Sequence, residues 1–255
     1  MKTTHKIIIG DCLEELKKIP SESIDLVFAD PPYNMSKKKG LGWKYSKHIT
    51  MEAEWDMFSK DGYFQFNKEW ISEALRVLKH GGSLWICGSF HNIYQVGFIL
   101  QHIEEVKINN SIVWFKPNAQ PNITCRMFTE STEHLIWASK NGKGKRWTFN
   151  YEDTKNKIED QINPKGRQTR NVWWIPLTPK KEKWAGPHPT QKPEELLRRI
   201  ILACTKPGET VLDPFVGSGT TSVVAKMLGR NSIGIEKEPK YKKIIDKRLG
   251  QEVLG

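Results

Sequence analysis

Residues 24–33, Ile-Asp-Leu-Val-Phe-Ala-Asp-Pro-Pro-Tyr, decide how the chain is organised. A short run of aliphatic, β-branched and aromatic residues is typical of a buried strand, and the two prolines end the strand because each lacks a backbone N–H donor. Asp30, Pro31, Pro32 and Tyr33 are therefore expected at a strand's carboxyl end. Ligands of open α/β sheets bind at that edge.

Asp30 is the first candidate for chemistry. Pro31 biases it away from helical backbone angles, so its carboxylate is held on a stiff, extended loop beside the Pro31 carbonyl. The motif thus offers two fixed hydrogen-bond acceptors and, in Tyr33, an aromatic face. A plain turn with a packed tyrosine is the simpler interpretation of four residues alone, because short motifs recur by accident. A second motif is needed before a functional site can be inferred from these four residues.

Strands and helices alternate along the chain. Hydrophobic patterning predicts strands at 7–9, 24–29, 83–87, 111–115, 132–138, 210–212 and 232–235. It predicts helices at 12–19, 64–78, 93–103, 193–204 and 222–228, with Gly81 and Gly82 ending the second. This alternation is typical of the α/β class and predicts a doubly wound, mostly parallel sheet.

The second motif is Asp-Pro-Phe-Val-Gly-Ser-Gly-Thr-Thr at 213–221, between a predicted strand and a predicted helix. Glycines let the backbone approach a ligand closely, and the helix amino end offers unpaired N–H groups. Glu236 follows the next strand, about 20 residues further on, where an acidic residue can accept both ribose hydroxyls. The third glycine of a dinucleotide fingerprint and the lysine of a P-loop are missing, which favours a nucleoside without phosphates.

The charge balance points to a polyanionic partner. The 255 residues carry a net charge of +11, and between 138 and 188 basic residues outnumber acidic ones more than two to one. Basic residues interleaved with aromatic ones, there and in the loop 34–56, suit phosphate contact and base stacking. A mobile solvated loop and a basic surface that serves only solubility stay open as alternatives.

Cysteine usage and hydropathy exclude several classes of protein. The four cysteines are scattered without a CxxC pair or a histidine at ligand spacing, so we expect neither a disulfide framework nor a metal site. No stretch approaches the roughly 18 apolar residues of a membrane span, and residues 1–20 lack a signal-peptide core. We expect a cytoplasmic protein without membrane contact.

Taken together, the motifs resemble those of the amino DNA methyltransferases, and their order resembles the β group of that family. In that group the DPPY-like motif comes first, a basic recognition region follows, and the glycine motif lies near the carboxyl end. The matching stretches are Gly10-Asp11, 30–33, 188–193 (HPTQKP), 213–221 and 233–236. Residues 121–137 and 182–193 are most similar to the DpnA-type adenine methyltransferases, whose target is GATC.

The resemblance implies S-adenosylmethionine as the cofactor, in a pocket built from both ends of the chain. Asp11 would accept a hydrogen bond from the adenine of the cofactor and Glu236 would hold its ribose, and Cys12 and Asp30 would also bind the cofactor. The remaining implied cofactor residues are Thr190, Lys192, Asp213, Phe215, Gly217, Ser218, Gly219 and Thr220. Two of these have plainer interpretations from the sequence, since Asp11 suits a helix cap and Lys192 a solvated lysine before a helix.

The resemblance also implies the reaction, which is methyl transfer to the N6 amino group of adenine in DNA. Asp30 and the Pro31 carbonyl would accept the two amino hydrogens, Pro32 would stiffen the loop, and Tyr33 would stack on the base. The adenine would be flipped out of a duplex or presented single-stranded, because a stacked base cannot reach such a loop. No metal is required.

The expected organisation is a catalytic and cofactor-binding domain at 1–137 and 188–255, with DNA recognition by the loop 34–56 and the insertion 138–187. A restriction-modification context, a cognate restriction endonuclease and a homodimer come with the resemblance, and the sequence leaves the last two open. Methylation of cytosine N4 is the alternative within the same chemistry. A non-catalytic nucleic-acid-binding module with a vestigial cofactor pocket is the alternative from another class.

Overall fold

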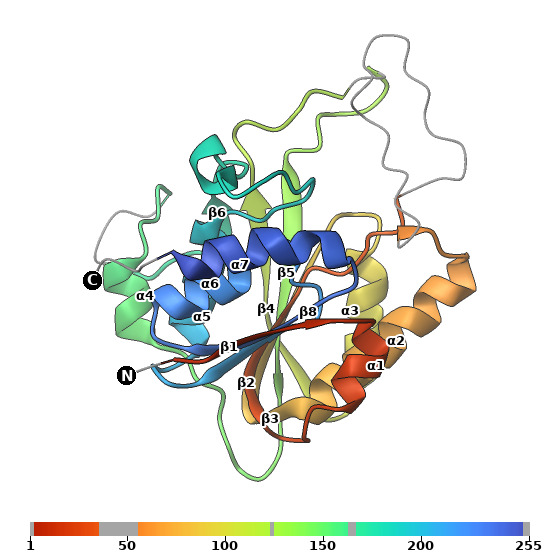
Figure 1. Ribbon diagram of the computed structural model, residues 1–255, viewed down its shortest axis with the longest axis vertical. Coiled ribbons are helices and arrows are strands. Elements are labelled where there is room, and N and C mark those ends of the chain that lie inside the picture. Colours follow the sequence, from red (N-terminus) through yellow and green to blue (C-terminus); the bar gives the residue numbers. More distant parts are fainter. Residues whose placement is uncertain (1–2, 36–55, 123–124, 163–166, 252–255) are drawn as a thin grey trace.

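The computed structural model describes residues 3–35, 56–122, 125–162 and 167–251 (Figure 1). Its strands are β1 (His5–Ile9), β2 (Ile24–Ala29), β3 (Leu78–Gly88), β4 (Val106–Phe115), β5 (Thr132–Lys140), β6 (Val172–Trp174), β7 (Thr210–Asp213) and β8 (Asn231–Glu236). Its α-helices are α1 (Cys12–Lys17), α2 (Lys60–Val77), α3 (Ile93–Gln101), α4 (Tyr151–Lys157), α5 (Glu194–Cys204), α6 (Thr220–Met227) and α7 (Lys242–Gly250). Short 3-10 helices lie at Lys180–Lys183 and Pro239–Tyr241.

The eight described strands form one sheet in the order β1-β8-β7-β2-β3-β5-β4-β6. Strand β5 runs antiparallel to both of its neighbours, β3 and β4, and every other pair is parallel. The predicted doubly wound, mostly parallel α/β fold is therefore confirmed. Ile9 of β1 pairs with Glu236 of β8, so the two ends of the chain meet in the sheet, as expected.

Helices cover both faces of this sheet (Figure 1). Helices α1, α2 and α3 pack on one face, over a core that includes the fully buried Trp70. Helices α5 and α6 pack on the other face, where Trp85 stacks on Trp137 and Trp173 at ring-centroid distances of 5.4 and 5.9 Å. Within the described part of the chain, no helix has the length and apolar character needed to span a membrane.

Four parallel strands end at the same edge of the sheet, and each is followed by a residue singled out from the sequence. Asp11 follows β1, Asp30 follows β2, and Asp213 and Glu236 are the last residues of β7 and β8. The antiparallel β5 begins at this same edge, because His134 pairs with Gly88 at the end of β3. The acidic residues at the ends of the parallel strands are thus joined at this edge by the first residues of β5.

The glycines expected to end the helix before β3 lie inside the strand. Helix α2 ends at Val77, and Gly81 and Gly82 belong to β3. A Cβ atom on Gly82 would lie 2.9 Å from the Asp25 carbonyl oxygen of the neighbouring β2, so a close approach of two strands requires glycine there. The end of α2 is held instead by the buried Lys140, whose ammonium donates to the carbonyls of Leu75 and Leu78 at 2.8 and 3.2 Å.

We therefore expect Lys140→Met to lower the free energy of unfolding by about 1 to 3 kcal/mol, because two buried carbonyls would lose their donor. Urea denaturation followed by circular dichroism measures this. Lys68→Met is the matched control, since Lys68 is an exposed residue of the same helix, and it should change stability by less than about 0.5 kcal/mol. Equal losses in the two variants would contradict the assigned role of Lys140.

Candidate cofactor and catalytic site

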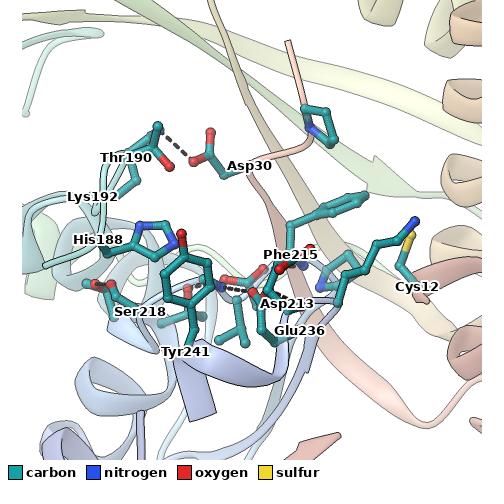
Figure 2. Close-up of a pocket in the computed structure, with 18 of the residues that line it drawn as sticks. Cys12, Asp30, His188, Thr190, Lys192, Asp213, Phe215, Ser218, Glu236 and Tyr241 are labelled. Atoms are coloured by element: carbon teal, nitrogen blue, oxygen red, sulfur yellow. Dashed lines mark hydrogen bonds and ion pairs between the residues drawn. The ribbon is translucent and has the colours of Figure 1, made fainter. Parts of the chain in front are cut away.

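A cleft lies at the edge of the sheet where these strands end (Figure 2). Its volume is about 940 Å³, including the mouth that opens to solvent, which is within the range of small-molecule sites. Twelve residues singled out from the sequence line it: Asp11, Cys12, Asp30, Pro32, Thr190, Lys192, Asp213, Phe215, Gly217, Ser218, Thr220 and Glu236. The strand ends thus bring residues from both ends of the chain into one cavity.

Three of the singled-out residues do not line the cleft: Pro31, Tyr33 and Gly219. The Tyr33 hydroxyl turns toward Glu133 and Cys87 on β5 and β3. Gly219 has a left-handed backbone with φ of +83°, and a Cβ atom there would lie 2.9 Å from Ile245 of α7. Glycine at 219 therefore allows the start of α6 to pack closely against Ile245 of α7.

The Asp213 carboxylate holds the glycine turn in place through two hydrogen bonds. Its carboxylate accepts hydrogen bonds from the Phe215 backbone N–H at 2.9 Å and from the Thr221 hydroxyl at 2.5 Å. Burial raises the pKa of Asp213 to about 7. Both oxygens are thus engaged with the turn itself, and Asp213 fixes the shape of the cavity.

Glu236 holds the other side of the glycine turn from the neighbouring strand β8. Its carboxylate accepts the backbone N–H of Gly217 at 2.9 Å and that of Glu238 at 2.7 Å. Burial raises the pKa of Glu236. Each carboxylate oxygen has a second lone pair, so Glu236 can still accept hydrogen bonds from hydroxyls of a ligand.

Asp11 does cap a helix, as one interpretation of the sequence had it. One of its oxygens accepts the Leu13 backbone N–H at 3.0 Å, and the other pairs with the Lys237 ammonium at 3.1 Å. Asp11 also lines the cleft, so capping and contact with a ligand are compatible. Burial raises the pKa of the adjacent Cys12 thiol to about 12, which keeps it a neutral, weakly polar wall.

Two further residues shape the cleft and were not assigned from the sequence. The buried Arg248 of α7 donates to the Ser218 carbonyl at 3.0 Å and to the Thr220 hydroxyl at 2.8 Å, and it pairs with Glu194 at 2.8 Å. His188 packs on Tyr241 with ring centroids 4.3 Å apart. Arg248 carries no motif, whereas His188 begins the HPTQKP stretch and could have been included for that reason.

His188 is held in its neutral form. Burial lowers the pKa of His188 to about 4, and the positive charges of Lys192 and Arg248 add to the effect. Its Nδ1 atom is buried and has no hydrogen-bond partner among the residues that the structure describes. A Cβ atom on Gly217, whose φ is +53°, would come within 3.0 Å of the imidazole, so glycine is required where the turn crosses this ring.

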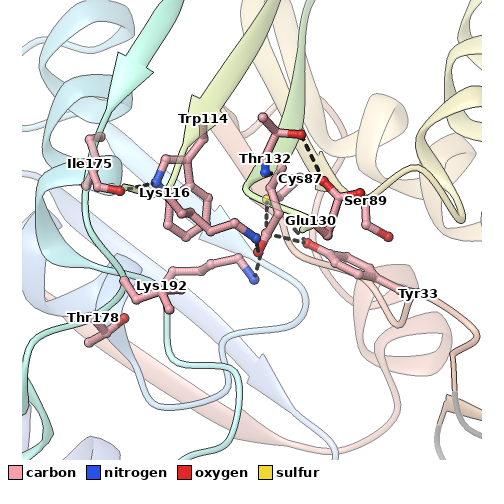
Figure 3. A network of polar contacts seen from close by, with 12 residues as sticks. Tyr33, Cys87, Ser89, Trp114, Lys116, Glu130, Thr132, Ile175, Thr178 and Lys192 are labelled. Atoms are coloured by element: carbon pink, nitrogen blue, oxygen red, sulfur yellow. Dashed lines mark hydrogen bonds and ion pairs between the residues drawn. The ribbon is translucent and has the colours of Figure 1, made fainter. Parts of the chain in front are cut away.

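A buried cluster of charged side chains surrounds Asp30. The Lys192 ammonium contacts one Asp30 oxygen at 2.6 Å, and the Tyr33 hydroxyl donates to the other at 2.7 Å. Figure 3 shows Lys192, Tyr33 and Lys116 converging from separate segments. Each of the three contacts the carboxylate of Glu133. Lys192 is thus a buried, ion-paired residue, and its interpretation as a solvated lysine is wrong.

The family model described as DNA methylase matches residues 24–247. Over 248 residues the chain is 49% identical to the type II methyltransferase M2.DpnII of Streptococcus pneumoniae, covering 96% of this chain and 90% of the relative. It is 44% identical to the type II methyltransferase M.HinfI of Haemophilus influenzae over 252 residues, which covers 96% of this chain and 68% of the relative.

Solved structures share the architecture. The complex of M1.HpyAVI with S-adenosylmethionine superposes with a TM-score of 0.70 at 27% identity, covering 97% of this chain and 100% of that chain. The cytosine-N4-specific PvuII DNA methyltransferase superposes with a TM-score of 0.75 at 20% identity, covering 100% and 89%, and it shares the fold.

These matches run through both motifs and the sheet that joins them. They confirm the resemblance seen in the sequence and the expected cofactor. The chain belongs to the DNA methylase family and is a DNA methyltransferase that uses S-adenosylmethionine.

Proposed function

We propose that this enzyme methylates the N6 amino group of adenine at a specific site, GATC, as the modification half of a restriction-modification system. The observation that carries the proposal is the rigid Asp30 carboxylate at the mouth of the cofactor cleft, held by Tyr33 and Lys192. An aspartate as the first residue of the motif at 30–33 favours the N6 amino group of adenine over the N4 amino group of cytosine as the methyl acceptor. The GATC target rests on the similarity of 121–137 and 182–193 to DpnA-type enzymes.

The cleft fits S-adenosylmethionine by its size and by its donor and acceptor groups. When bound, this cofactor would supply a methyl group from a positively charged sulfur; the bond from sulfur to that methyl group breaks in the transfer and leaves neutral S-adenosylhomocysteine. Glu236 would accept from the ribose hydroxyls and Asp11 from the adenine, while the glycine turn at Gly217 lets the nucleoside lie against the backbone. The unpartnered Nδ1 of His188 is one more polar atom in the wall of the cleft.

Asp30 and Pro31 would hold the amino group of the target base. The Asp30 carboxylate accepts one amino hydrogen and the Pro31 carbonyl the other, which draws the nitrogen lone pair toward the methyl group. As the new N–C bond forms, the amino nitrogen gains positive charge, and the carboxylate stabilises that charge. The extra proton then passes from the nitrogen to an Asp30 oxygen and on to water, which leaves a neutral methylamino group.

The DNA would reach this site with the adenine turned out of its stack, because Asp30 lies at the mouth of a cleft that a paired base cannot enter. Residues 138–187 would supply recognition, together with the loop 34–56, of which 36–55 lie outside the described residues. A cognate endonuclease, a homodimer and a cytoplasmic location belong to the same proposal.

Expression in a host whose own DNA is unmethylated at GATC tests the function directly. Sequencing that detects modified bases should find N6-methyladenine at GATC in cells with the wild-type chain and none with Asp30→Ala. Purified Asp30→Ala should still bind S-adenosylhomocysteine within about threefold of wild type, because Asp30 contacts the amino group rather than the bulk of the cofactor. N4-methylcytosine would assign the alternative base, and an unmodified genome would favour a binding module.

Tyr33 offers a second test, because its ring and its hydroxyl have separate roles. Tyr33→Phe keeps the aromatic face but removes the donor to Asp30, so we expect kcat to fall about tenfold, which corresponds to one hydrogen bond of about 1.4 kcal/mol. Tyr33→Ala should lose more, since base stacking goes too. Steady-state methylation of a GATC duplex measures both, with the exposed Tyr94 changed to Phe as a control. A fully active Tyr33→Phe enzyme would exclude the orienting role.

A further inference from the structure

Glu133 is a largely buried acidic residue next to Asp30, and the reaction described above does not use it. It lies at the start of β5, and its side chain is 15% exposed, the same fraction as that of Asp30. Its carboxylate contacts the Lys116 ammonium at 3.2 Å and the Tyr33 hydroxyl at 3.1 Å. A buried carboxylate with such partners is held in one orientation.

The Lys192 ammonium lies between two carboxylates. It is 2.6 Å from an Asp30 oxygen and 3.6 Å from a Glu133 oxygen, and its side chain is only 10% exposed. Charge-assisted N–H···O contacts of this kind are about 2.7 to 2.9 Å long, so a shift of about 1 Å would move the ammonium from Asp30 to Glu133. The flexible four-carbon stem of lysine allows such a shift.

The Tyr33 hydroxyl links the same two carboxylates. It lies 2.7 Å from Asp30 and 3.1 Å from Glu133, and its single proton can serve one of them at a time. Burial raises the pKa of Tyr33 well above its ordinary value, and Asp30 adds to the effect, so the hydroxyl stays protonated. Asp30 and Glu133 therefore share a lysine and a tyrosine, and a change at one carboxylate is felt at the other.

Lys192 conflicts with the proposed chemistry as long as it stays on Asp30. There it places a positive charge beside an amino nitrogen that must itself become positive. Like charges in a buried site repel strongly, because the surroundings screen them little. The ammonium needs another buried acceptor within reach when the target base arrives.

We propose that Glu133 is a positioning residue for methyl transfer, which takes over the Lys192 ammonium when the target amino group donates to Asp30. This inference rests on the proposed function. The transfer keeps the cluster neutral as a whole, since two lysines face two carboxylates before and after the shift. No proton moves and no bond forms between Glu133 and the base.

The pKa shifts of Glu133 and Asp30 agree with these separate roles. Burial opposes ionisation of Glu133, but Lys192 and Lys116 outweigh it, and its pKa is lowered, so Glu133 stays a carboxylate. Burial raises the pKa of Asp30, Lys192 offsets part of the rise, and Glu133 adds to it. The groups that face Asp30 from the packed elements are Lys192, Glu133, Tyr33, Cys87 and Asp213, with Lys116 behind Glu133.

Methylation of a GATC duplex by the full-length protein, measured between about pH 5 and 9, tests the proposal. Glu133→Gln should lower kcat about tenfold or more, because Lys192 then stays on Asp30. Loss of the Glu133 charge also lowers the pKa of Asp30, so the acid limb of the kcat profile should move to lower pH. S-adenosylhomocysteine binding should stay close to wild type, while the melting temperature should fall, because Lys116 and Lys192 then share a single carboxylate. Glu130→Gln is the matched control, since Glu130 is exposed and only three residues away.

A double-mutant cycle with Lys192→Met separates positioning from a structural role. If Glu133 acts through Lys192, adding Glu133→Gln to Lys192→Met should change kcat by less than about twofold. An equal loss in both backgrounds, or a Glu133→Gln enzyme with wild-type kcat and an unmoved acid limb, overturns the proposal.

Glu133→Asp gives an independent measurement, which also serves if Glu133→Gln does not fold. It keeps the charge but retracts it by one methylene, so the loss should be intermediate and the shift of the acid limb smaller in the same direction. A Glu133→Asp enzyme with wild-type kcat and an unmoved acid limb counts against the inference. A wild-type protein that methylates no DNA would instead refute the proposed function.

Discussion

The parallel pairing of β1 with β8 is the constraint on which the site depends. It brings the first and last strands of the chain together, and with β7 and β2 it aligns four strand ends at one edge. Acidic residues at those ends then face a common cleft. A nucleoside with a cationic tail suits such a ring of carboxylates, which explains why one enzyme needs both ends of its chain to build one pocket.

The charged cluster around Asp30 is a second organising feature, and it arises from the one antiparallel strand. Because β5 enters the sheet at the edge where β2 and β3 end, Glu133 comes within reach of Lys192 and Tyr33. Buried charges are costly unless they are paired, and here two lysines and two carboxylates compensate one another. The reversal of β5 thus supplies the acidic partner that a wholly parallel sheet would place at its other edge.

Local patterns were enough to predict the strands that end at Asp30, Asp213 and Glu236, because each is a short apolar run stopped by an acidic or proline-containing turn. They were not enough for residues that act from a distance. Glu133 and Arg248 belong to neither motif, and their roles depend on β5 and α7 folding back onto the site. Because of Gly81 and Gly82, the start of β3 was predicted at residue 83 rather than at Leu78, since glycine serves a close strand contact as readily as a helix end. The periodicity of α4 and β6 was too short to detect among lysines and tryptophans.

The contacts of Arg248 give the last helix a part in shaping the cleft. This guanidinium is the donor to the Ser218 carbonyl and contacts the hydroxyls of Ser218 and Thr220, so the glycine turn keeps its shape only while α7 is folded. Ligand occupancy and the folding of the carboxyl-terminal helix are then thermodynamically linked. A protease that cuts within α7 would empty the pocket, and a filled pocket would protect α7 from the protease.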